Sequence, residues 1–335
     1  VSSDFFPLSD RNQFVVDIWV PESAPIDRTG KVGQHLEKLI RALGKKTFRD
    51  GRWVDIQQED ARLTNFCSMI GLGGPYNYPG LYPKSDASNY GVVWVSTKTG
   101  DQVPQFLADI KIAAARGVGD PDGADYVPPI TGARIVPHQL VMGTPVASPV
   151  DIRLLGPRLG NEKTFREFGA RIEQVVRDTG IAFDVSNSWG EYGRQIDVLL
   201  DDEKANLAGV TNVSAALSMN AYYSGQQLTT FREGDRQIPV KLRLPPEQRR
   251  SLEELDSVHV SGLTGKVPLD SVAQINRSWQ PAKLQRYQRE RCFSVRARPQ
   301  AGVLYSEVIE AAQPGLDEIQ AELPPGYRIE HGGTK

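Results

Sequence analysis

The chain has 335 residues, of which 39% are hydrophobic and 24% charged, and its formal net charge is −2. At roughly 100–200 residues per domain, this length predicts two or three domains of ordinary globular composition. The near-neutral charge argues against a nucleic-acid partner, which would require a basic face. No stretch approaches the roughly 18 consecutive apolar residues that a membrane-spanning helix requires, so we expect none in this chain.

The two ends of the sequence and its two cysteines lead to further predictions. The start lacks the basic segment and apolar run of a signal peptide. The chain opens without methionine at Val1 and stops at Lys335, as a piece of a larger protein would. The two cysteines, Cys67 and Cys292, cannot form a CxxC metal site. We expect two buried, free thiols rather than one long-range disulfide.

The first part of the chain predicts the element order β-α-β-β-α-β. The predicted strands are residues 12–21, 65–70, 90–97 and 133–142, and the predicted helices are residues 25–43 and 103–114. The first strand alternates, with Asp17 and Trp19 facing away from its apolar positions, which indicates a half-buried strand. This order is the ferredoxin-like plan, which belongs to the α+β class.

The same order restarts near residue 149 but is interrupted. The predicted strands are residues 149–155, 181–186, 284–298 and 327–331, and the predicted helices are residues 161–177 and 304–323. A segment at residues 194–200, a helix near 212–221 and strands at 226–231 and 238–244 intervene. Pro314 is expected to kink or break the last helix. The sequence therefore predicts a second ferredoxin-like unit with a mixed α+β subdomain inserted at its middle.

Four stretches of this sequence resemble the resistance-nodulation-division (RND) efflux transporters of the AcrB type. The opening segment, from Phe6-Pro7 through Asp10-Arg11-Asn12-Gln13, resembles the segment that follows the seventh membrane helix in that family. The other three are residues 202–211 (DEKANLAGVT), 267–273 (VPLDSVA) and 323–333 (LPPGYRIEHGG). They occur in the family's order and span almost the whole chain, which makes the resemblance specific.

The resemblance implies that the chain is the second large periplasmic loop of a bacterial inner-membrane pump. Residues 1–147 would form a first porter subdomain, residues 148–191 with 282–335 a second one, and residues 192–281 a docking subdomain. Family members are proton-driven antiporters that work as homotrimers with a periplasmic adaptor and an outer-membrane channel. Their coupling carboxylates lie in membrane helices outside this chain, so the chain alone is expected to bind substrate at best.

No catalytic arrangement stands out in the sequence. The four histidines, His35, His138, His259 and His331, fall in no metal-ligand spacing. Neither a G-x-S-x-G elbow nor a phosphate-binding loop is present. We therefore expect no enzyme, no cofactor and no metal site.

Residues 71–89 form a glycine-rich loop that carries Tyr76, Tyr78 and Tyr82. Glycine lets a backbone move, and tyrosine offers a large apolar face with a polar tip. An ordinary surface loop without a binding role could have the same composition. In the AcrB-type family the switch loop between two drug pockets lies here, and the resemblance implies that Leu72 and Gly74 match positions often occupied by Phe. The three tyrosines are candidate replacements.

The fourth strand carries Arg134 and His138, which make it more polar than the resemblance predicts. Both are candidate substrate contacts, and together with the departures at Leu72 and Gly74 they put the family's aromatic drug pocket in doubt. The expected substrates are amphiphilic small molecules.

Two other functions remain open. A metal-exporting branch of the family uses a methionine cluster, and here Cys67 and Met69 share a strand face while Met142 ends the fourth strand. Soft sulfur ligands suit Cu(I), although core packing explains the same residues. The chain could also be a stand-alone periplasmic binding or assembly module.

A run of arginines near the C-terminus indicates a solvated or pore-facing strand. Its members are Arg286, Arg289, Arg291, Arg296 and Arg298. The family usually has an Asn-Gly hairpin turn here. Because this chain has Gln288-Arg289 instead, we expect a different turn.

Overall fold

The structure is a computed structural model. It describes residues 9–74, 81, 84–141, 148–245, 258–263, 265–300 and 302–333. It divides into two compact units, one made of Val1–Gly193 with Pro281–Lys335 and the other of Arg194–Gln280. Both units mix helices with antiparallel sheets, which confirms the predicted α+β class.

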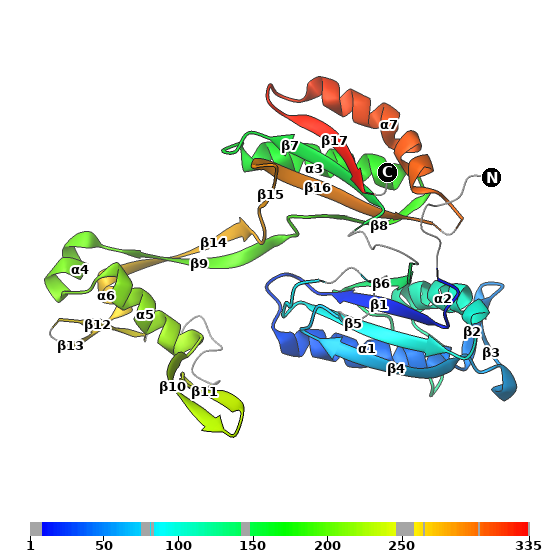
Figure 1. Ribbon diagram of the computed structural model, residues 1–335, viewed down its shortest axis with the longest axis horizontal. Coiled ribbons are helices and arrows are strands. Elements are labelled where there is room, and N and C mark those ends of the chain that lie inside the picture. The colour runs from blue at the N-terminus through cyan, green and yellow to red at the C-terminus, as the bar shows by residue number, and fades with distance from the viewer. Residues whose placement is uncertain are drawn as a thin grey trace. The chain divides into compact units, whose positions relative to one another are not determined.

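The first sheet of the larger unit has the strand order β4-β5-β1-β6 and two helices on one face (Figure 1). Its elements are β1 (Gln13–Trp19), α1 (Ile26–Leu43), β4 (Leu63–Ile70), β5 (Tyr90–Thr97), α2 (Val103–Arg116) and β6 (Arg134–Gln139). Phe14, Val16 and Ile18 of β1 pack with Leu36 of α1 and Phe106 of α2 in one apolar core. The alternation of β1 thus directs every second side chain into the core between sheet and helices.

The expectation that β1 is half-buried is wrong, because its other face is covered as well. Val15 and Asp17, which point away from the helices, are 0% and 2% exposed. Val15 packs in a second apolar cluster that includes Leu81, Tyr90 and Leu140. β1 is therefore a central strand with both faces buried, and it carries a carboxylate on the face opposite the helices.

A hairpin and two short helices were not predicted. They are β2 (Lys46–Arg49), β3 (Arg52–Asp55), η1 (Gln58–Asp60) and η2 (Gly100–Gln102). The hairpin turns at Asp50-Gly51, where both residues have positive φ, 51° and 79°. Asp-Gly between two strands is a strong hairpin pattern, so the sequence did contain this feature.

The second sheet of the larger unit has the order β15-β16-β7-β17, with β8 also paired to β16. Its elements are β7 (Val150–Gly156), α3 (Glu162–Asp178), β8 (Ala182–Asn187), β15 (Gln285–Tyr287), β16 (Glu290–Pro299), α7 (Tyr305–Glu322) and β17 (Arg328–Gly333). Ile152, Phe293 and Val295 pack with Phe165 of α3 and Leu316 of α7. Polar side chains of β16, including Arg296 and Arg298, alternate with these core residues.

Two local expectations concern Pro314 in the last helix and the turn at Gln288-Arg289. The helix α7 runs from Tyr305 to Glu322 with Pro314 inside it, so the helix is not broken there. Its buried residues on both sides of the proline, such as Ala312 and Leu316, hold the helix on the core and offset a cost of about 3 kcal/mol. The turn at Gln288-Arg289 has positive φ at both positions, 49° and 71°. Those are the signs of φ that an Asn-Gly turn uses, so the expected different turn does not form.

The described residues of the smaller unit, which leave out 246–257 and 264, form three two-stranded sheets and three short helices. Its elements are β9 (Tyr192–Leu200), α4 (Asp202–Ala208), α5 (Asn212–Tyr223), β10 (Gln226–Glu233), β11 (Arg236–Leu242), β12 (His259–Gly262), β13 (Gly265–Pro268), α6 (Leu269–Val272) and β14 (Ala273–Pro281). The carboxylate of Asp201 accepts a hydrogen bond from the backbone of Lys204 and caps α4, and Gly209 ends that helix with φ 64°. All residues of β10 and β11 are exposed.

In the described part of the chain, no helix is long and apolar enough to span a membrane.

One buried ion pair ties the unpredicted hairpin to the first sheet's helices. Arg62 Nη2 lies 2.7 Å from Asp109 Oδ2 of α2, and the two side chains are 6% and 0% exposed. The same carboxylate accepts hydrogen bonds from Thr47 Oγ1 at 2.9 Å and from the backbone of Phe48 at 3.2 Å. Its loss would leave a buried guanidinium without its counter-charge.

We expect Asp109→Asn to lower the free energy of unfolding by about 3–5 kcal/mol, because it leaves Arg62 buried and unpaired. Urea denaturation followed by circular dichroism measures the change. Glu322→Gln, which breaks an exposed pair with Arg171, is the matched control and should leave the midpoint nearly unchanged. Equal effects of the two substitutions would contradict the structural role of Asp109.

Candidate functional site

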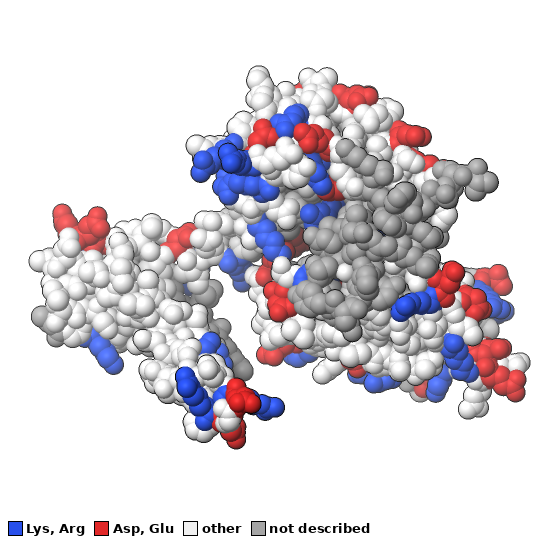
Figure 2. Space-filling model, in the orientation of Figure 1, with Lys and Arg blue, Asp and Glu red and all other residues white. Residues whose placement is uncertain are grey.

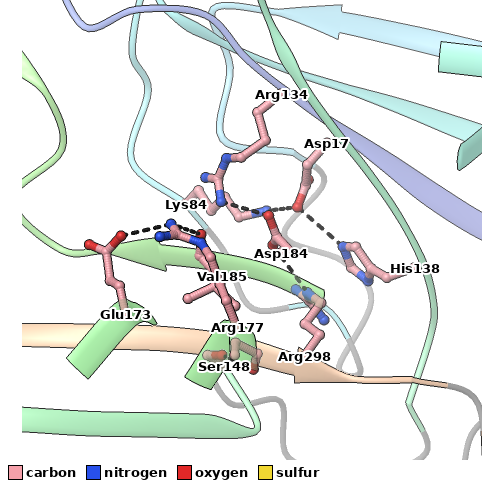
Figure 3. A network of polar contacts seen from close by, with 11 residues as sticks. Asp17, Lys84, Arg134, His138, Ser148, Glu173, Arg177, Asp184, Val185 and Arg298 are labelled. Carbon is pink, nitrogen blue, oxygen red and sulfur yellow. Dashed lines mark hydrogen bonds and ion pairs between the residues drawn. The ribbon is translucent and has the colours of Figure 1, made fainter. Parts of the chain in front are cut away.

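The candidate site starts from the buried carboxylate of Asp17 on β1. Lys84 Nζ contacts its Oδ2, Tyr90 Oη donates to its Oδ1 at 2.7 Å, and His138 Nε2 lies 3.2 Å from Oδ2 (Figure 3). A carboxylate only accepts hydrogen bonds, so the His138 nitrogen that faces it must carry a proton. The Asp17 side chain is 3% exposed, and its negative charge is satisfied by donors from three different segments.

Aromatic rings lie beside this network. The rings of Trp19 and Tyr90 are 4.5 Å apart. Lys84 Nζ is 4.9 Å from the centre of the Tyr90 ring, and Arg134 Cζ is 5.7 Å from the centre of the Trp19 ring. These distances are within the range of cation–π attraction.

The second sheet contributes Asp184 to the same place. Arg134 Nη1 donates to Asp184 Oδ1 at 2.7 Å, and Arg298 Nε lies 3.9 Å from Asp184 Oδ2. Lys111 Nζ of α2 lies 3.4 Å from the centre of the Phe183 ring. Side chains of both sheets of the larger unit thus meet in one polar cluster, which we call the junction and define as Asp17, Trp19, Lys84, Tyr90, Lys111, Arg134, His138, Phe183, Asp184 and Arg298.

Local backbone irregularity aims Asp184 at the first sheet. Asp184 has φ 55°, in the left-handed region, and the pairing of β8 with β16 shifts register between Arg296 and Arg298. A β-bulge of this kind redirects a side chain out of the regular alternation. Asp and Asn tolerate left-handed φ better than most residues, and such strained positions cluster at functional sites.

The junction perturbs the pKa values of its own groups. Burial alone would raise the pKa of Asp17, but the hydrogen bonds and charges of His138 and Lys84 outweigh it and lower that pKa. Burial and the charge of Arg298 lower the pKa of His138 below its ordinary 6.5, so we assign a neutral imidazole at neutral pH and take Lys84 as the cation that holds Asp17. Burial and the neighbouring Asp17 raise the pKa of the Tyr90 hydroxyl.

Only some of the site residues expected from the sequence belong to the junction. Arg134 and His138 both belong to the junction. Gly74 is buried with φ 102°, and a Cβ there would lie 3.6 Å from Leu81 and Val92, on the face of the first sheet that carries Asp17. Leu72 is 51% exposed. Tyr76, Tyr78 and Tyr82 lie outside the described residues.

Six polar residues of the junction were not named as site residues from the sequence. They are Asp17, Lys84, Tyr90, Lys111, Asp184 and Arg298. A carboxylate in the middle of an apolar strand is an anomaly that could have drawn attention to Asp17. Nothing local identifies Asp184, because its role depends on a bulge and on pairing with another sheet.

The cysteines form no disulfide, and one of them differs from expectation. Both are free, but Cys67 is exposed whereas Cys292 is buried, so the expected burial of Cys67 is wrong. Cys67 and Met69 lie two residues apart on β4 and therefore share a face. Within the described residues no group of three or more His, Cys, Asp or Glu side chains is placed to hold a metal ion.

His138 makes the stability of the protein depend on pH. Its pKa is lowered on folding, so just below pH 6.5 the unfolded chain binds a proton that the folded protein does not. The stabilising contribution is therefore full above pH 6.5 and is lost as pH falls through the folded-state pKa. We expect the melting temperature to fall from about pH 7 to about pH 5, and His138→Gln, which keeps a donor to Asp17, to flatten that fall.

Differential scanning fluorimetry across this pH range measures the effect. His331→Gln removes an exposed histidine on β17 and is the matched control, which should keep the wild-type slope. Parallel curves for the wild type and His138→Gln would contradict the assignment of a neutral, buried imidazole.

Comparison with known proteins places this fold in a family. Residues 135–335 match the profile of the AcrB/AcrD/AcrF family. Similar proteins include the nickel and cobalt resistance protein CnrA of Cupriavidus metallidurans, 27% identical over 202 residues, which are 58% of this chain and 18% of that protein. The cation efflux protein CusA of Escherichia coli K12 is 26% identical over 217 residues, 62% of this chain and 19% of that protein.

An uncharacterized transporter of Haemophilus influenzae is 25% identical over 137 residues, 41% of this chain and 13% of that protein. The matches thus span less than a fifth of the length of each of these relatives. Because the family profile matches more than half of the residues, this chain belongs to the AcrB/AcrD/AcrF family of RND transporters.

Proposed function

We propose that the chain is the periplasmic substrate-binding and docking portion of a proton-driven RND efflux pump, and that its substrates are amphiphilic small molecules. Membership of a transporter family supports the transport role. The observation that carries the substrate class is the junction, where aromatic rings and charged side chains of two sheets meet. Sites for amphiphiles combine apolar faces with a few placed polar groups.

The domain assignment is part of this proposal. Residues 1–147, and residues 148–191 with 282–335, would be two ferredoxin-like porter subdomains. In each sheet the strand that starts the unit, β1 or β7, lies in the interior of the sheet beside β5 or β16, which supports the assignment. Residues 192–281 would be the docking subdomain, and the compact unit Arg194–Gln280 supports this.

The ion pair between the two sheets is weak enough to allow the proposed porter subdomains to move apart and together. Arg134 and Asp184 bridge the sheets, and their side chains are 41% and 14% exposed. An ion pair so near the surface stabilises weakly, about 0–1 kcal/mol, and can break and reform. We propose that the two porter subdomains hinge about this contact, one of the motions by which proteins close around ligands.

The smaller unit offers a surface for partners. Phe231 on β10 is 58% exposed, and Ile238, which lies opposite it on β11, is 43% exposed. Clustered exposed apolar residues commonly mark interaction sites. We propose that this surface contributes to contacts with a periplasmic adaptor, an outer-membrane channel or the neighbouring subunits of a homotrimer in the full-length protein.

Export of a metal cation is the second candidate, and the names of the relatives favour it. CnrA is named for resistance to nickel and cobalt, and CusA is named for cation efflux. Met69 and Cys67 could supply soft ligands, whereas the third sulfur considered, Met142, lies outside the described residues. The junction itself is unfavourable for a metal cation, because Lys84, Arg134 and Arg298 would repel it.

We expect the neutral dye N-phenyl-1-naphthylamine to bind the chain weakly, and Trp19→Ala to reduce its affinity about fivefold through the loss of an aromatic face. The double substitution Tyr76→Ala with Tyr78→Ala should reduce it further if these tyrosines contact substrate. Dye fluorescence measures the affinity.

Trp279→Ala is the matched control, because that ring belongs to the smaller unit and is 62% exposed. An affinity that responds equally to Trp19→Ala and Trp279→Ala would remove the junction as the binding site. An affinity unchanged by the tyrosine substitutions would remove the loop at residues 71–89.

If the chain binds metal cations instead, Cu(I) or Ag(I) should bind tightly and the affinity should drop at least about tenfold in Met69→Ala, which removes a soft ligand. Competition with a chromophoric chelator measures it. Met219→Ala, in the smaller unit, is the control for loss of a methionine. Affinities that do not distinguish the two variants would end the metal hypothesis for this site.

A further inference from the structure

We infer that the junction binds the anionic group of its substrate, so that the amphiphiles it takes up carry a carboxylate, phosphate or sulfonate. This inference rests on the proposed function and adds to it the charge of the substrate. It follows from the balance of charges, from the donors of Arg298 that bond to no protein group among the described residues, and from the aromatic faces beside the cations.

The junction holds more cations than carboxylates. Its cationic side chains are Lys84, Lys111, Arg134 and Arg298. Its carboxylates are Asp17 and Asp184, and the imidazole of His138 is neutral. Four positive charges thus face two negative ones, which leaves a surplus of two positive charges in a partly buried place.

The two carboxylates are already committed to partners. Asp17 accepts from Lys84, Tyr90 and His138 and is nearly fully buried. Asp184 accepts a direct hydrogen bond from Arg134 at 2.7 Å. Asp184 is also shared with Arg298 at 3.9 Å, so two carboxylates are divided among four cations and cannot balance them all.

Arg298 is the cation with the weakest protein partner. Among the described residues, its one ion pair is the 3.9 Å contact between Nε and Asp184 Oδ2, and no hydrogen bond from its guanidinium is present. Its charge lowers the pKa of Lys84, Lys111 and His138, which shows that it lies near all three. A guanidinium has five N–H donors in a planar fork that fits a carboxylate or phosphate.

Exposure increases from the carboxylate side of the junction to the cationic side. The side chain of Asp17 is 3% exposed, that of Lys84 20%, that of Arg298 22% and that of Arg134 41%. Figure 3 shows Arg134, Arg298 and Asp184 close together between strands of the two sheets. A ligand therefore meets positively charged donors first, and Asp17 acts behind them as a fixed support for Lys84.

Aromatic faces beside the cations account for the apolar part of the ligand. Trp19 lies under Arg134, and Phe183 lies under Lys111. Rings that already contact cations place a flat apolar surface next to positive charge. An aromatic anion can use both features, whereas a cation of the same shape is repelled by the surplus positive charge.

Two dyes with the same ring system test the inference directly. 1-Anilinonaphthalene-8-sulfonate carries one sulfonate, and N-phenyl-1-naphthylamine lacks it. We expect the wild-type chain to bind the sulfonate dye about tenfold or more tightly than the neutral dye, the ratio that one charge-assisted hydrogen bond supplies. Added salt should reduce this ratio.

Arg298→Gln should reduce the affinity for the sulfonate dye about tenfold and the affinity for the neutral dye by a clearly smaller factor, so that most of the preference is lost. Arg298→Lys should keep part of the preference, because the charge remains while the planar fork is lost. Arg289→Gln, at the exposed turn between β15 and β16, is the matched control and should behave as the wild type. Circular dichroism melts of each variant separate a loss of binding from a loss of fold.

The outcomes distinguish the inference from the proposed function. Equal affinity for the two dyes, or a preference that survives Arg298→Gln, overturns the anion site while binding of the neutral dye through Trp19 still supports the proposed function. Failure of both dyes to bind overturns both. Tighter binding of a cationic dye than of the sulfonate dye overturns the inferred charge class alone.

Discussion

A carboxylate on the interior face of a central strand has to be satisfied by the surrounding structure, and Asp17 places that demand on the first sheet. An unpaired buried charge costs several kcal/mol, whereas one that is paired and hydrogen-bonded is tolerated. The three donors come from the segment before β5, from β5 itself and from β6. Asp17 therefore fixes the position of Lys84 and His138, the two groups from which the junction extends toward the second sheet.

The second sheet contributes Asp184 to the junction because the pairing of β8 with β16 is irregular. In β16 the residues alternate between core and surface, which puts Arg298 on the face away from α3 and α7. Asp184 arrives there only because β8 has a bulge and a left-handed residue. The resulting Arg134–Asp184 bridge is weak and partly exposed, so little free energy is needed to break it.

The positive charge of the junction contrasts with the cations for which the similar proteins are named. Two of the similar proteins, CnrA and CusA, are named for metal resistance or cation efflux, yet the junction of this chain has a surplus of positive charge. Membership of one family does not determine the substrate, because function depends on the residues of the site rather than on the fold. The charge of the ligand proposed for the junction therefore has to be measured on this chain.

The sequence alone indicated the α+β class, the family, and the order of the main strands and helices in both halves of the larger unit, but not the β2–β3 hairpin. Apolar periodicity and short motifs can be recognised along the chain without knowledge of its tertiary contacts. The sequence also indicated Arg134 and His138, since two polar residues stand out in a strand. It did not show that Asp17 is buried on both sides, that Pro314 is tolerated inside α7 or that Gln288-Arg289 adopts positive φ. Those outcomes, like the meeting of Asp184, Arg298 and Arg134, were decided by the tertiary structure, because they depend on contacts between segments tens to more than a hundred residues apart.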